Sequence, residues 1–132
     1  MKRVKKHTLL NGAKVITLSN HGYSFSDGTS CSAQNREIVS QFSLERSYSP
    51  KGEVRGMKLN QMKMVLSSKQ KEDLLKIQDM ADLVIVPFPV LTALRETGER
   101  DQFSRCVAYN ATKETQRSPL AEKIVDINNW SY

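Results

Sequence analysis

Hydrophobic and polar positions alternate in the first third of the chain, which predicts β-structure there. Ile16 and Leu18 fall on one face of the run VITLS, with polar Thr17 between them, the period-two pattern of a strand. Turn signals follow at Asn20-His21-Gly22 and Asp27-Gly28, where glycine supplies the positive φ of a tight turn. We therefore predict an antiparallel meander, a further strand over residues 38–46, and a loop over residues 48–53.

The middle of the chain changes to a helical period. Apolar residues in the stretch 58–66 recur at three- and four-residue spacing and predict a helix. Ser67 and Gln70 match a capping box, which predicts that a second helix begins there. Residues 81–86 fit a buried strand or a helix end equally well. Past the prolines, Pro89 in a first turn and Gly98 as a stop predict a short helix.

Strand patterns return in the last third, where residues 103–109 and 123–130 alternate on either side of a polar stretch. No internal repeat or linker divides the 132 residues, a length that fits one domain. The prediction is thus a single α+β ligand-binding domain over residues 1–132. Its mainly antiparallel sheet is built from N- and C-terminal strands, with two to three helices between.

Charge and cysteine usage narrow the class of protein. The 20 lysines and arginines exceed the 14 carboxylates and give a net charge of +6, which favours anionic partners but also fits a solvated basic surface. Cys31 and Cys106 form no CxxC motif, and the longest apolar run is too short for a membrane span. We expect a cytoplasmic protein with free thiols and no contact with a membrane.

The sequence lacks the motifs of common catalytic and metal sites. His7 and His21 have no acidic residues at metal-ligand spacing. No serine stands in a GxSxG motif, and neither a Walker loop nor GxGxxG is present. We therefore expect a binding protein rather than an enzyme, without a metal or cofactor.

Phe88 and the arginines are the strongest candidates for a binding site. Phe88 lies between two prolines, which hold an aromatic ring in place before a ligand arrives; the alternative is a core position between two elements. An arginine fork suits phosphate oxygens, and Arg55, Arg95, Arg105 and Arg117 are the candidates. Long nucleic acid is less favoured than a nucleotide, because the basic runs and the aromatic residues fall on different segments.

The segments LSNHGYSFSDG and ADLVIVPFPVLTALRE, followed by two terminal strands, resemble the phage Thoeris anti-defence sponge family. The resemblance implies a phage protein that binds a cyclic ADP-ribose signal made by a bacterial TIR protein and sequesters it unchanged. It also implies homodimers or hexamers, and for some members further sites for cyclic oligonucleotides. The ligand would then lie between subunits in the bacterial host cytoplasm.

The family's site consists of an aromatic base-stack and arginines on the pyrophosphate. Phe88 best fits the aromatic partner, Arg55, Arg105 and Arg117 fit the arginines by type and placement, and Asn110 could bond a base edge. The alternative function is a small basic phage regulator that binds nucleic acid or a host transcription protein through its basic tail and helices.

Overall fold

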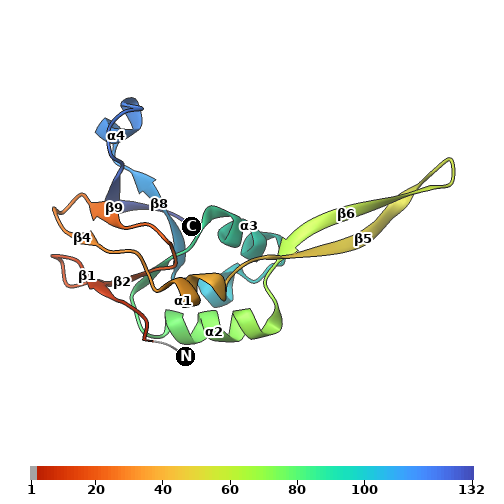
Figure 1. Ribbon diagram of the computed structural model, residues 1–132, viewed down its shortest axis with the longest axis horizontal. Coiled ribbons are helices and arrows are strands. Elements are labelled where there is room, and N and C mark those ends of the chain that lie inside the picture. Colours follow the sequence, from red (N-terminus) through yellow and green to blue (C-terminus); the bar gives the residue numbers. More distant parts are fainter. Residues whose placement is uncertain (1–2) are drawn as a thin grey trace.

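The chain folds into a body and a long projecting arm, shown in Figure 1 for the computed structural model. The structure describes residues 3–132. The body contains strands β1 (His7–Thr8), β2 (Lys14–Thr17), β3 (Tyr23–Phe25), β4 (Ser30–Cys31), β7 (Leu83–Ile85), β8 (Cys106–Ala111) and β9 (Ile124–Ser131). Its helices are α1 (Arg36–Ser40), α2 (Ser68–Gln78), α3 (Phe88–Glu96), the 3₁₀ helix η1 (Arg100–Phe103) and α4 (Lys113–Arg117). The arm is the hairpin of β5 (Glu45–Val54) and β6 (Met57–Val65).

The body strands form one mixed sheet in the order β1-β2-β7-β8-β9-β3-β4. Pairs β2–β7, β7–β8 and β3–β9 are parallel, while β1–β2, β3–β4 and β8–β9 are antiparallel. The sheet curls until its two ends meet. There His7 Nε2 lies 2.9 Å from Thr29 Oγ1, and the His7 ring stacks on Phe25 with 5.2 Å between the ring centroids.

Side chains alternate across the sheet and fill two cores. Ile16 and Val84 face the helices and join a cluster with Leu74 of α2 and Leu91 of α3. Their neighbours point to the other face, where Val15, Ile85 and Val125 lie inside the curl. Because successive residues of a strand face opposite sides, a short apolar run such as residues 83–86 supplies both cores.

Helix α2 begins where the sequence signals predict, and helix α3 both begins and ends there. Ser67 Oγ accepts a hydrogen bond from Gln70 N, and Gln70 Oε1 accepts one from Ser67 N, which is the complete capping box of α2. Helix α3 carries a proline in its first turn, and Gly98 follows it with φ 72°. No helix in residues 3–132 has both the length and the apolar character that a membrane span requires.

The α+β architecture is confirmed, with a sheet drawn from both ends of the chain and α1, α2 and α3 between them. The predicted meander is wrong in one pairing, because β2 and β3 are not neighbours. Residues 81–86, which fitted a strand or a helix end equally well, contain the strand β7. Strands β8 and β9 are confirmed, although each extends one or two residues past the end of its predicted segment, and the polar stretch between them contains the short helix α4.

The predictions for the arm were wrong. Residues 57–65 form a strand rather than a helix, and residues 48–53, predicted as a loop, lie inside β5. Residues 36–40 form α1, so the predicted strand over 38–46 exists only from Glu45 onward. Neither face of the arm packs against a core, so its apolar residues do not need to alternate as they do in a half-buried strand. Their spacing of three and four residues therefore resembles that of a helix by chance.

Candidate functional site

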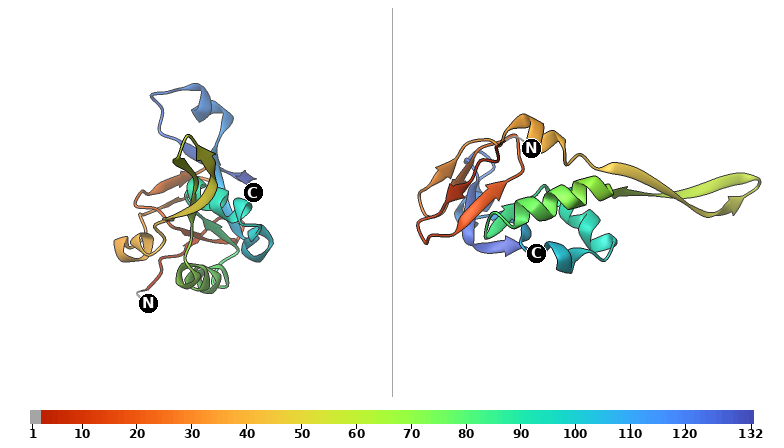
Figure 2. Two further views of the ribbon diagram at one scale, coloured as in Figure 1. Left: turned by 90° about the vertical axis from the view of Figure 1, so that its right-hand side faces the viewer. Right: turned by 90° about the horizontal axis from the view of Figure 1, so that it is seen from below.

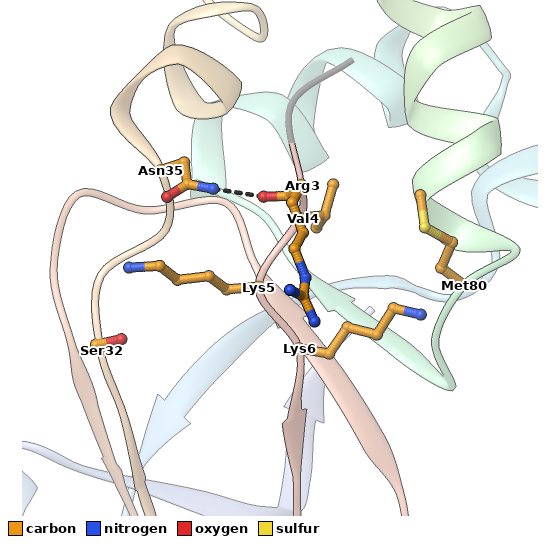
Figure 3. A pocket seen from close by; sticks show the side chains of 7 residues that line it. All are labelled: Arg3, Val4, Lys5, Lys6, Ser32, Asn35 and Met80. Atoms are coloured by element: carbon orange, nitrogen blue, oxygen red, sulfur yellow. Dashed lines mark hydrogen bonds between the residues drawn. The ribbon is translucent and has the colours of Figure 1, made fainter.

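A basic cleft lies beside the N-terminal segment (Figure 3). Its volume is about 940 Å³, and it is lined by Arg3, Val4, Lys5, Lys6, Ser32, Asn35 and Met80. In the close-up the side chain of Arg3 lies between those of Lys5 and Lys6, while Met80 stands across the opening. The lining therefore carries three cationic groups and no carboxylate.

The N-terminal segment is fixed to the body by a buried amide. Gln34 is only 5% exposed. Its Oε1 accepts a hydrogen bond from Lys5 N at 2.9 Å, and its Nε2 donates to Lys5 O at 3.0 Å. Asn35 Nδ2 also donates to the carbonyl of Arg3. Residues 3–6, which the sequence presented as a basic tail, are thus a wall of the cleft.

Within residues 3–132, no ion pair joins the lysines of the cleft to a carboxylate. Ion pairs in residues 3–132 join Lys69 to Asp73, Lys71 to Glu99 and Lys76 to Glu72, so they occupy the lysines of α2. Within the same residues the cleft lysines take part in none, and Lys5 Nζ instead donates to the carbonyl of Ala33 at 3.2 Å. A cleft with this unbalanced charge attracts anions.

Phe88 lies in a second, smaller groove at the base of the arm. The groove has a volume of about 300 Å³ and is lined by Met62, Lys63, Met64, Phe88, Pro89, Thr92, Ala93 and Glu96. Phe88 is 54% exposed, so it is not a core residue. Arg95 lies with its guanidinium carbon 5.9 Å from the centre of the Phe88 ring, a cation–π distance. These two are the predicted site residues that the structure brings together.

The other predicted site residues are spread over separate parts of the protein. Arg55 lies in the turn at the tip of the arm, with φ 50°. Arg105 Nη1 donates to the carbonyls of Gln78 and Ala81 at 3.3 Å each, which is a structural role. Arg117 ends α4. Asn110 donates to Asn129 O and accepts from Ser131 Oγ within the β8–β9 pair, so this amide is occupied by the fold.

The residues of the cleft were missed as a site, although part of the signal was visible. Arg3, Lys5 and Lys6 stand in a basic run of the sequence, and the run was assigned to a tail. Their polar and apolar neighbours come from residues 32–35 and from Met80 after α2. Only tertiary structure brings these segments to the N-terminus.

Burial raises the pKa of the Cys106 thiol to about 12, against a smaller lowering by Arg100, so this thiol is protonated at neutral pH. In residues 3–132 no group of three His, Cys, Asp or Glu side chains is placed to hold a metal ion. Comparisons with models of protein families, with curated proteins and with solved structures gave no match to this chain.

Proposed function

We propose that this chain is a non-catalytic binding protein that holds a phosphate-bearing nucleotide in the basic cleft. The observation that carries the proposal is the lining itself, with Arg3, Lys5 and Lys6 around one hollow and no carboxylate among them. Phosphate oxygens are the groups that Arg and Lys side chains bind best. The cleft volume of about 940 Å³ lies within the usual range of small-molecule sites.

The specific form of the proposal is a sponge. A cyclic ADP-ribose isomer has a pyrophosphate for the cations and apolar ring faces for Met80 and Val4, which also line the cleft. A protein that only sequesters this signal needs no nucleophile or general base. Binding through the cationic and apolar side chains of the cleft is sufficient for this role. This form agrees with the resemblance to the Thoeris anti-defence family and would block that bacterial immunity.

The expected contribution of each cation follows from its surroundings. Lys5 and Lys6 are exposed. The medium around a lysine–phosphate pair at about 4 Å therefore has an effective dielectric constant closer to that of water than to that of a protein interior. Each contact then contributes about 1 kcal/mol. Loss of two such contacts should weaken binding by about 2 kcal/mol, which is roughly 30-fold.

The test is calorimetric titration of the protein with cyclic ADP-ribose isomers. Lys5→Gln with Lys6→Gln should raise the Kd roughly 30-fold. The matched control is Lys69→Gln with Lys76→Gln, which removes the same charge from α2, where both lysines are paired with carboxylates. This control should leave the Kd within about twofold, since neither lysine lines the cleft and each already interacts with a carboxylate of α2.

A second measurement separates sequestration from catalysis. The complex is freed of excess ligand and heat-denatured, and the released nucleotide is chromatographed. Unchanged nucleotide supports a sponge, whereas a cleaved product would make the protein an enzyme. Equal weakening by the two lysine pairs would mean that the cleft is not the site.

The resemblance also implies a homodimer or hexamer. Light scattering at micromolar concentration tests this part of the proposal, and repeating it with bound nucleotide shows whether the ligand is shared between subunits. A monomer in both conditions would contradict an intersubunit site, while leaving a site within one chain intact.

A further inference from the structure

The arm, residues 45–65, extends from the body as a two-stranded ribbon, and the views in Figures 1 and 2 agree on this. Every side chain from Glu45 to Lys63 is exposed. At about 3.4 Å per residue, nine to ten paired residues give a length of roughly 30 Å. Two strands without a third, or without a helix to cover them, are only marginally stable in water. Both faces of the arm between Glu45 and Lys63 are therefore accessible to a partner.

The arm carries an excess of positive charge. It carries five cationic side chains and two carboxylates, a net +3 against +6 for the entire chain. The cationic side chains are Arg46, Lys51, Arg55, Lys58 and Lys63. Within residues 3–132 none of them takes part in an ion pair. An anionic partner would meet positive charge from the base of the arm to its tip.

Apolar side chains stand between these charges. Tyr48 pairs across the ribbon with Met62, and they are 61% and 49% exposed. Val54 pairs with Met57 on either side of the tip, and they are 50% and 61% exposed. Basic residues and Tyr48 thus share the arm, so the separation of basic and aromatic segments expected from the sequence does not hold for this element. Apolar side chains at such a tip can contact base edges in a groove, such as the methyl group of thymine.

Both edges of the ribbon are poorly suited to pairing with another strand. On β5, Pro50 lacks an N–H donor, and the ladder is irregular between Pro50 and Gly52. On β6, Lys58 and Lys63 place charges along the edge, a common protection against added strands. A second copy would also bring another net +3 against the first. The charge and the edges favour an anionic partner over a second arm.

We propose that the arm binds double-stranded nucleic acid, with the β5–β6 ribbon in the major groove of a B-form duplex. That groove is about 12 Å wide and admits a two-stranded β-ribbon. The cations of the arm then meet the phosphates on both sides of the groove, and Val54 and Met57 at the tip reach the base edges. Recognition is mainly electrostatic, so it is weakly dependent on sequence.

The test is fluorescence anisotropy with a labelled mixed-sequence DNA duplex of about 20 base pairs, measured between 50 and 200 mM salt. With all five cations on phosphates, the slope of log K against log salt concentration approaches about −4.5. Arg55→Asn with Lys58→Gln should make the slope less steep by about 1.8 units. Asn suits position 55, because it tolerates the positive φ found there.

The control is again Lys69→Gln with Lys76→Gln, which makes the same change in net charge. Its slope of log K against log salt concentration should equal that of the wild-type protein. A double-stranded RNA of equal length should bind more weakly, because its major groove is deep and narrow. Val54→Ser with Met57→Ser should weaken duplex binding without changing the salt slope.

Three results would each overturn the proposal. One is the absence of duplex binding at 50 mM salt, and another is the same slope for the arm variant and the control. The third is a dimer, seen by light scattering, that the arm substitutions abolish, since the partner would then be a second copy. None of these outcomes bears on the cleft, whose ligand is measured with the Lys5 and Lys6 variants.

Discussion

Gln78 is the buried polar side chain whose loss should destabilise the body most clearly. It is the last residue of α2 and is 7% exposed. Its Nε2 donates to the carbonyl of Gln102 at 3.0 Å, and its Oε1 accepts from Arg105 N at 3.0 Å. The Sγ of Cys106 also lies 3.6 Å from Oε1. One amide thus connects α2 to η1 and to the segment that leads into β8.

The perturbation is Gln78→Met, which keeps the length of the side chain and removes its hydrogen bonds. The N–H of Arg105 loses its partner inside the protein, at a cost of about 1–3 kcal/mol. Gln102 and Arg105 are both exposed residues, so water replaces part of each lost bond and the cost stays within this range. The thiol contact is weak, and the thioether of Met gains some apolar contact. The free energy of unfolding should fall by about 2 kcal/mol.

Urea unfolding followed by far-ultraviolet circular dichroism measures this difference through the transition midpoint. The control is Gln116→Met, because Gln116 is exposed and its Nε2 donates to a backbone carbonyl, that of Ala111, at 2.7 Å. The control should change the free energy of unfolding by less than about 0.5 kcal/mol. If Gln78→Met is no more destabilising than the control, then Gln78 does not connect these elements.

Three further predictions follow from exposure and from pKa. Phe88→Ala should cost at most about 1–2 kcal/mol of stability, because Phe88 is 54% exposed and only a fully buried Phe costs 3–5; it should also leave nucleotide binding in the cleft unchanged, and a calorimetric loss of binding would place the ligand at Phe88 instead. Desolvation raises the pKa of Asp27, but hydrogen bonds, led by one from the side chain of Thr29, outweigh it and lower that pKa overall. Asp27→Ala should therefore cost about 1 kcal/mol at neutral pH, and the difference from wild type should shrink as pH falls through the folded pKa; a difference that stays constant in urea titrations down to acid pH would contradict this. Iodoacetamide at pH 8 should modify Cys31, which is partly exposed, well before Cys106, whose pKa burial raises to about 12, and equal rates in peptide mass spectrometry would show that Cys106 is accessible.

Local signals in the sequence determined much of the body. The capping box at Ser67 and Gln70, and Pro89 with Gly98 around α3, are interactions among residues a few positions apart, so they are visible without a fold. The alternation in β8 and β9 was equally readable, because one face of each strand contacts a core. These features support the α+β class, which the structure confirms.

Tertiary structure decided the arm and both candidate surfaces. Periodicity reports which side of a segment faces a core, and the arm faces none, so its strands could not be recognised from their pattern. The pairing of β3 with β9 joins segments 100 residues apart along the chain, and no local signal specifies such a contact. The basic run at the N-terminus was visible, but it becomes a cleft only because Gln34 binds the backbone of Lys5 from a position 29 residues away. Charge is a property of the sequence, whereas its arrangement around a hollow or along a ribbon depends on contacts that only the folded chain makes.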